Sequence, residues 1–246
     1  MNAPLILSES AGGITTLTLN RPTKRNAFTH EMCEQLRDEL RRFEASDNRV
    51  LVLAANGPVF TAGADLGDPP SQFWKALPGL GIDVTKPTIA AIEGPVVGMG
   101  VAILGFFDLC VASEEASLLY PEAKVGVAAG LISALSCRIP HKIALELMLL
   151  GEAIPARRAY EVGFVNRLTP KGMALKEAQK LAQSLADNAP LVMSFLKRMV
   201  NATLPHSPVE NMYQTQFEAE IVAASQDAQE GLQAFREKRR PNFTGR

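Results

Sequence analysis

The sequence predicts a layered α/β fold followed by a helical tail. Short apolar strands alternate with helices between residues 5 and 112, and strand patterns nearly vanish after residue 130. No linker rich in glycine and serine divides the 246 residues, so we expect both parts to share one fold. The expected division is a core over residues 1–190 and a C-terminal helical region over residues 191–246.

Local signals place the first elements. Gly12 and Gly13 separate two short apolar runs, as in a hairpin turn. Thr29 can cap a helix over 30–45, on one face of which apolar residues recur every three or four positions. The uninterrupted apolar run at 50–55 is typical of a strand buried on both faces. The strands expected here are 5–8, 14–19, 50–55, 88–92 and 108–112, and the second helix is 98–107. Their β-α-β-α-β order favours right-handed crossovers.

The second part of the chain reads as helices punctuated by Pro190 and Pro205. The expected helices are 131–139, 142–150, 155–162, 171–187, 191–202, 208–224 and 227–239, with one short strand at 164–168. A helical tail of this length is either a second domain or an oligomerisation surface.

Composition excludes several classes of protein. The chain is 47% hydrophobic, which excludes disorder as its main state. Its 25 Lys and Arg against 26 Asp and Glu give a net charge of −1, so we expect no nucleic-acid and no membrane partner. The longest apolar run, 96–107, is too short to span a bilayer, and residues 1–9 lack the features of a secretory signal. We expect a cytoplasmic protein.

The cysteines support a reduced compartment. Cys33, Cys110 and Cys137 form no C-x-x-C motif and lie at no zinc-binding spacing. Cys33 and Cys110 fall in apolar-periodic runs, so we expect buried free thiols.

Two glycine-containing loops follow predicted strands at points where a helix should begin. They are 60–66 and 94–100. Glycine lets the backbone approach a ligand closely, and a helix start leaves free N–H donors. Two such loops at neighbouring strand ends could direct two N–H groups at one oxygen, which is the geometry of an oxyanion hole. Glycines at strand–helix junctions are common, so residue types alone favour plain turns at both loops. A dinucleotide site at Gly98-x-Gly100 fits poorly, because the third glycine position is Ile103.

Candidates for acid–base chemistry are few. His30, His141 and His206 have the surroundings of surface or capping residues, and no G-x-S-x-G motif is present. Glu122 follows Tyr120 and Pro121 in apolar surroundings. A lone carboxylate there should have a raised pKa and could move a proton near neutral pH. The alternative is a glutamate at a helix start, satisfied by backbone donors.

At these residues the sequence resembles the crotonase superfamily, also called the enoyl-CoA hydratase/isomerase family. The match is collinear from about residue 14 to residue 243. The segments that carry it are Asn20-Arg21-Pro22, Asn26-Ala27, 60–66, 90–94, Gly98-Met99-Gly100, 108–113, Pro121-Glu122, Leu150-Gly151-Glu152, 159–165 and 235–241. Together and in this order they are specific for the superfamily, though not for one reaction.

The resemblance implies a crotonase-like core, a spiral of ββα units, with a helical tail that builds homotrimers or dimers of trimers. It implies an acyl-CoA thioester substrate, no cofactor beyond the CoA of the substrate, and no metal. The backbone N–H groups of Ala64 and Met99 match the two oxyanion-hole positions, and Glu122 matches a catalytic glutamate. The residues it implies for substrate or CoA binding are Lys24, Arg25, Ala27, Ala62, Asp65, Leu66, Gly98, Phe235 and Lys238. The basic residues among them are also what a solvated surface would carry.

The chain departs from the family pattern where the reaction is decided. Family hydratases carry two glutamates, and the first of them falls at Ala102 here. Met99 replaces the middle glycine of a Gly-Gly-Gly run that is common in the family. Gly67 replaces a lysine that is frequent there, and residues 126–131 lack the usual Gly-Gly pair.

One carboxylate suffices to move a double bond, whereas hydration must position and deprotonate a water. We therefore expect Δ3,Δ2-enoyl-CoA isomerase chemistry with Glu122 as the single proton shuttle. The alternatives are a 2-enoyl-CoA hydratase, another crotonase reaction, or a non-catalytic acyl-CoA-binding protein. Phe73, Trp74 and Leu77 are candidate pocket walls, or else core or trimer contacts.

Overall fold

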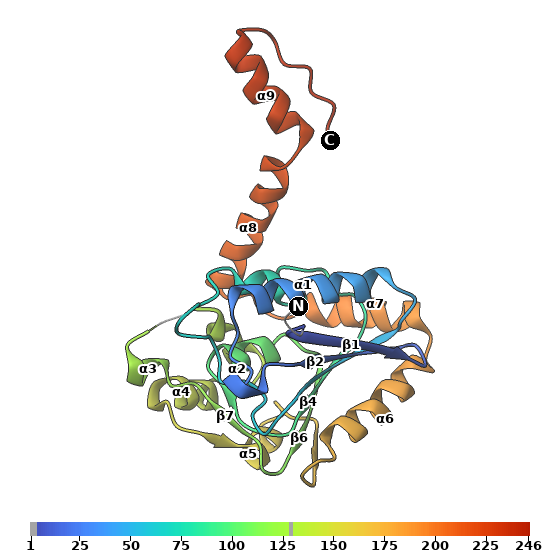
Figure 1. The fold of residues 1–246 in the computed structure, drawn as a ribbon, viewed down its shortest axis with the longest axis vertical. Coiled ribbons are helices and arrows are strands. Elements are labelled where there is room, and N and C mark those ends of the chain that lie inside the picture. Colours follow the sequence, from blue (N-terminus) through green and yellow to red (C-terminus); the bar gives the residue numbers. More distant parts are fainter. Residues whose placement is uncertain (1–3, 128–129) are drawn as a thin grey trace.

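The computed structural model describes residues 4–127 and 130–246 and contains two sheets wrapped by helices (Figure 1). The larger sheet has the order β1-β2-β3-β4-β6-β9 and the smaller has the order β5-β7-β8. The strands are β1 (Ile6–Ala11), β2 (Ile14–Leu19), β3 (Val50–Ala55), β4 (Thr88–Ile92), β5 (Val96–Val97), β6 (Leu109–Ser113), β7 (Ser117–Leu119), β8 (Ile154–Pro155) and β9 (Arg167–Thr169).

The larger sheet is parallel except at its first hairpin. β1 and β2 pair antiparallel through a turn in which Gly12 and Gly13 both have positive φ (59° and 77°), a conformation that glycine adopts without steric cost. The remaining pairs of this sheet, β2–β3, β3–β4, β4–β6 and β6–β9, are all parallel. The carboxyl ends of β3 and β4 therefore lie at the same edge, and the two glycine-containing loops leave from that edge.

Helices cover both faces of this sheet. They are α1 (His30–Ala45), α2 (Met99–Leu104), α3 (Glu122–Val125), α4 (His141–Leu150), α5 (Ala156–Glu161), α6 (Ala174–Ala186), α7 (Pro190–Asn201), α8 (Pro208–Ala223) and α9 (Gln226–Glu237), with 3₁₀ turns at η1 (Pro22–Lys24), η2 (Phe73–Ala76) and η3 (Gly130–Cys137). On one face α1 contributes Met32, Leu36 and Leu40 to the main core. On the other, α6 presents a stripe of buried alanines at i, i+4 spacing, which lets the helix approach β3, β4 and β6 closely.

The C-terminal helices extend away from this core. Figure 1 shows α8 leaving the body and α9 lying beyond it, far from both sheets. The base of α8 is fixed by Trp74 of η2, which is 1% exposed and stacks on Tyr213 with ring centroids 4.9 Å apart. A nearly buried ion pair joins Arg138 to Glu210 at 3.2 Å. We call α8 and α9 together the arm. Its outer part carries exposed apolar side chains, Phe235 among them.

Most expected elements are confirmed. The helix at 30–45 and the strands at 14–19, 50–55 and 88–92 have the predicted bounds, and Thr29 caps α1 by accepting from the Met32 N–H. The expected helix at 131–139 is a 3₁₀ helix over Gly130–Cys137. The small strands β5, β7 and β8 were not predicted, because two or three residues carry no periodic pattern. Cys33 and Cys110 are buried free thiols, as expected.

Among the described residues, no helix is long and apolar enough to cross a membrane.

Candidate active site

The first glycine-containing loop runs beside residues 25–28. The Phe28 N–H donates to the Gly63 carbonyl, and the Asp65 N–H donates to the Phe28 carbonyl, both at 2.8 Å. One residue before them, the Ala62 N–H donates to the Arg25 carbonyl at 2.9 Å. These bonds lie on either side of Ala64, whose own N–H donates to no acceptor among the described residues. The loop therefore presents one unused backbone donor.

Asn26 holds the partner segment in place. Its side chain is fully buried and its φ is 52°, in the left-handed region that asparagine tolerates better than most residues. Its Oδ1 accepts from the Arg21 N–H at 2.8 Å, and its Nδ2 donates to the carbonyls of Asn56 and Val59, both at 2.9 Å. The Thr61 hydroxyl donates to the Asn26 carbonyl at 2.7 Å. The asparagine of the sequence motif therefore connects the two segments that frame Ala64.

Arg21 holds the C-terminal end of the first loop through Asp65. Its Nη1 lies 2.6 Å from Asp65 Oδ2 and also donates to the Ala27 carbonyl at 3.1 Å. The Gly67 N–H donates to the other carboxylate oxygen of Asp65 at 2.9 Å. The Arg21 guanidinium is the main reason that the pKa of Asp65 lies below its usual value. Both oxygens of Asp65 are thus bound within the loop, a role that the sequence analysis missed.

The second loop is joined to the first. The Phe60 N–H donates to the Pro95 carbonyl and the Val97 N–H donates to the Thr61 carbonyl, both at 3.0 Å. α2 then begins at Met99, whose N–H also donates to no acceptor among the described residues. A Cβ on Gly63 would lie 3.6 Å from the Met99 nitrogen, so the residue preceding Ala64 touches the start of α2. The fold thus brings the two predicted donors to adjacent positions, where two N–H groups can bind one oxygen.

Glu122 is the acidic group at this junction. It begins α3 three residues after the end of β7, and its Oε1 lies 2.9 Å from the point that a Cβ on Gly98 would occupy. Its Oε2 is buried and has no hydrogen-bond partner among the described residues. Burial raises the pKa of Glu122, and its own backbone N–H opposes the shift in part. A carboxyl group with this environment can exchange a proton at a higher pH than an exposed glutamate can.

No second carboxylate comes from α2. All six residues of that helix are apolar or glycine, and all six are buried, Ala102 among them. The three histidines, His30, His141 and His206, are exposed. Within the described residues, no group of three or more His, Cys, Asp or Glu side chains is placed to hold a metal ion.

The structure brings together some of the predicted contact residues and not others. Lys24 and Arg25 are exposed on the segment that borders the first loop, and Leu66 is exposed at the end of that loop. Ala27, Ala62 and Asp65 belong to the hydrogen-bonded framework described above, and Gly98 precedes α2 with its N–H donating to the Leu119 carbonyl at 2.8 Å. Phe235 and Lys238 lie at the end of α9, away from the loops of the same chain (Figure 1).

The candidate pocket walls are buried side chains. Phe73, Trp74 and Leu77 all belong to the main core cluster. Trp74 packs against α8 through Tyr213 and Phe217, so it joins the arm to the core.

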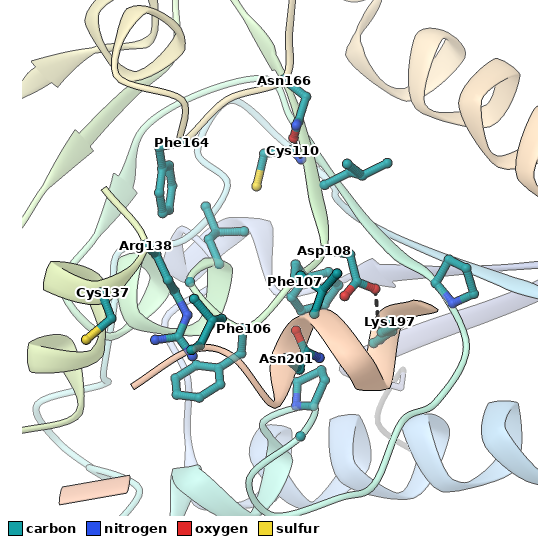
Figure 2. Close-up of a pocket in the computed structure, with 18 of the residues that line it drawn as sticks. Phe106, Phe107, Asp108, Cys110, Cys137, Arg138, Phe164, Asn166, Lys197 and Asn201 are labelled. Carbon is teal, nitrogen blue, oxygen red and sulfur yellow. Dashed lines mark hydrogen bonds and ion pairs between the residues drawn. The ribbon is translucent and has the colours of Figure 1, made fainter. Parts of the chain in front are cut away.

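A well-formed cavity lies away from this junction. It has a volume of about 590 Å³ and lies at the opposite end of α2, between that helix and α7. Figure 2 shows Phe106, Phe107 and Arg138 around it, with the ion pair between Lys197 and Asp108 at 2.8 Å. Its charged groups are paired with one another, and neither Ala64, Met99 nor Glu122 lines it. We therefore place the candidate active site at the two loops, on the geometry of the donors and the acid.

Known proteins resemble this chain over nearly its whole length. The family model described as "Enoyl-CoA hydratase/isomerase" matches residues 9–246. A Thermus thermophilus protein named "Putative enoyl-CoA hydratase" is 36% identical over 94% of this chain and 98% of its own length. An Escherichia coli protein named "1,2-epoxyphenylacetyl-CoA isomerase" is 31% identical over 98% of both chains. The crystal structure of an enoyl-CoA hydratase/isomerase from Pseudoalteromonas atlantica has a TM-score of 0.77 and 31% identity, over 98% of this chain and 100% of its own.

Proposed function

The chain belongs to the enoyl-CoA hydratase/isomerase family of crotonase-fold enzymes, which act on acyl-CoA thioesters, and from this premise we propose that it moves the double bond of an enoyl-CoA. The proposed reaction is of the Δ3,Δ2-enoyl-CoA isomerase type, with Glu122 as the single proton shuttle. The observation that carries it is the pairing of a half-buried Glu122, whose Oε2 is buried and has no partner among the described residues, with an α2 made only of apolar residues and glycine.

The proposed mechanism uses one acid and two backbone donors. The Glu122 carboxylate takes a proton from the α-carbon of a 3-enoyl thioester, and the electron pair of that C–H bond moves toward the thioester oxygen. The N–H groups of Ala64 and Met99 bind the oxygen of the resulting dienolate. The protonated Glu122 then delivers its proton to the γ-carbon, which leaves the double bond between the α- and β-carbons and restores the carboxylate. No water is consumed.

Two features of the site support this assignment in energetic terms. Removal of one oxyanion-hole donor in a characterised hydrolase costs about 2.7–4 kcal/mol of transition-state stabilisation. Both donors proposed here are backbone groups without competing acceptors among the described residues. Burial raises the pKa of Glu122, which brings the shuttle closer to the pH at which both its protonated and ionised forms are populated.

Hydration of a 2-enoyl-CoA is the second candidate, and the name of the Thermus thermophilus relative favours it. In that reaction Glu122 alone would have to position a water, deprotonate it and return a proton to the α-carbon. Ala102 stands where a second carboxylate would share this work. A non-catalytic acyl-CoA-binding role agrees least with an acid that sits beside two unused donors.

We propose that the CoA nucleotide is bound by basic residues from two copies of the chain. Lys24 and Arg25 border the first loop, whereas Phe235 and Lys238 lie on the distant arm. In a trimer or a dimer of trimers, the arm of one copy would bring its Phe235 and Lys238 to the loop of another. The exposed apolar side chains of α7 to α9 are the surface that such an assembly would cover.

Product analysis in D₂O with matched 2-enoyl and 3-enoyl CoA thioesters tests the reaction. The isomerase proposal expects interconversion of the two enoyl products and no hydroxyacyl product, with deuterium entering the α- and γ-carbons only as far as protonated Glu122 exchanges with solvent between the two steps. Accumulation of 3-hydroxyacyl-CoA would overturn it in favour of hydration. Glu122→Gln should abolish turnover and keep thioester binding, whereas Glu161→Gln, at an exposed position on α5, should leave both unchanged. Unchanged turnover of Glu122→Gln would remove that residue from the mechanism.

A further inference from the structure

We propose that Gly98 is the positioning residue for the Glu122 carboxylate. In this proposal the absence of a Cβ at Gly98 leaves room for the carboxylate beside the backbone. That room fixes the distance between the proton shuttle and the oxyanion donor at Met99. The inference rests on the proposed role of Glu122 as the shuttle.

The backbone around Gly98 brings the two residues together. Val97 of β5 pairs in parallel with Leu119 of β7, and the Gly98 N–H donates to the Leu119 carbonyl at 2.8 Å. The chain leaving β7 reaches Glu122 three residues later. Gly98 itself has φ 54° and ψ −120°, a conformation that side chains with a Cβ rarely adopt. The same glycine therefore ends β5, begins α2 and faces the end of β7.

Contact with the carboxylate is what a side chain at Gly98 would remove. An added Cβ would lie 2.9 Å from Glu122 Oε1 and 3.8 Å from Glu122 Cδ, and the first distance is shorter than real Cβ contacts. It would also lie 4.0 Å from the Cα of Gly63. The carboxylate thus borders the space that a side chain at Gly98 would occupy, and Gly63 of the first loop borders the same space.

No other residue among those described holds the carboxylate there by a polar contact, because its hydrogen bond comes from the backbone N–H of Glu122 itself. Its buried Oε2 has no partner, and Oε1 makes no side-chain hydrogen bond or ion pair. A group that no other residue fixes by hydrogen bonds is placed by the atoms that it touches, because protein interiors are close-packed. The position of the Glu122 carboxylate therefore depends on the shape of Gly98 more than on any electrostatic contact.

A double-mutant cycle tests the proposal. Gly98→Ala should move the carboxylate by about 0.5 Å, from 2.9 Å to an ordinary contact of 3.4 Å, and lower kcat by about 10-fold, with a much smaller change in KM. Glu122→Asp shortens the side chain by one carbon, roughly 1.5 Å, which makes room for the added methyl group. In the Glu122→Asp background, Gly98→Ala should therefore lower kcat less than about 3-fold. Equal losses in both backgrounds would overturn the proposal, because they would mean that the substitution acts through Met99 or through backbone strain.

Matched variants separate this effect from loss of folding and from failure of the proposed function. Gly163→Ala introduces the same methyl group at a glycine with φ 84° and no atom within 4 Å, so it should unfold at lower denaturant but keep kcat. If Gly98→Ala alone does not fold, the same substitution in a Glu122→Ala background should fold. Failure in both backgrounds would overturn the proposal. Full turnover of Glu122→Gln would refute the shuttle, whereas an inactive Glu122→Gln with additive Gly98→Ala losses would refute only the role of Gly98.

Discussion

Gly94→Ala should disturb the spacing of the two loops that carry the oxyanion donors. A Cβ on Gly94 would lie 2.0 Å from the Pro58 carbonyl oxygen, whereas real Cβ contacts are no shorter than 3.0 Å. The chain segments that contain Pro58 and Gly94 would therefore separate by about 1 Å. These segments lead into the two loops, which are bonded to each other through Phe60 and Pro95. The displacement must therefore reach either the Ala64 side or the Met99 side.

The size of the effect follows from this displacement. A misplacement of about 1 Å in a catalytic constellation can cost about 100-fold in rate, which corresponds to about 2.7 kcal/mol of transition-state stabilisation. Inserting a methyl group into packed backbone costs a further 1–3 kcal/mol or so of folding stability. We expect Gly94→Ala to lower kcat/KM about 100-fold and to reduce the free energy of unfolding measured in urea.

The control is Gly105→Ala at the end of α2. Gly105 has φ −60° and ψ −17°, which alanine adopts readily, and its nearest atom would be 3.2 Å away. This variant should stay within about 1 kcal/mol of the parent in stability and should keep kcat/KM. If Gly94→Ala has the kcat/KM and stability of the parent protein, the close approach of Gly94 to Pro58 does not set the spacing of the two loops, and the reasoning is refuted.

Three further predictions concern the arm, the reaction and the buried acid. Trp74→Ala should lower the free energy of unfolding in urea by about 3–5 kcal/mol, because the ring is 1% exposed and stacks on Tyr213; a loss below 1 kcal/mol would contradict this. Ala102→Glu should raise hydration of a 2-enoyl-CoA, measured as 3-hydroxyacyl product; a fall in a folded variant would mean that the site is not arranged around a hydrating water. Burial raises the pKa of Glu122, so the native state of the parent loses stability as pH rises through that pKa. Thermal unfolding should therefore show Glu122→Gln gaining stability over the parent at pH 8 and not at pH 4, and a pH-independent difference would contradict the shift.

The elements predicted from sequence are those specified locally. α1 has an apolar stripe and a capping threonine within 17 residues, from Thr29 to Ala45, so pattern and cap agree. β3 and β4 are uninterrupted apolar runs, as expected of parallel strands buried on both faces. By contrast, β5 is only Val96–Val97 and becomes a strand because β7 pairs with it. That pairing is a tertiary contact and leaves no trace in either short segment.

The candidate site also contains residues that the sequence indicated and contacts that only the folded structure shows. Residue types and the family resemblance pointed to Ala64, Met99 and Glu122, because glycines and an isolated acid stand out in a sequence. The supporting contacts did not stand out. Arg21 and Asp65 are 44 residues apart, and their ion pair is an outcome of the fold. The assembly of Phe235 and Lys238 with the first loop stays a prediction, because it depends on a second copy of the chain.

The smaller sheet determines at which stage of partial unfolding the catalytic arrangement is lost. β5 and β7 are paired at two positions only, Val96 with Leu118 and Val97 with Leu119, whereas the larger sheet has six strands. Short ladders open at lower free energy than large sheets do. The acid and the donors can therefore separate while the main core stays folded. In rising denaturant, activity should be lost before the helical circular dichroism signal is, so that the working lifetime of the enzyme depends on its weakest pairing rather than on its global stability.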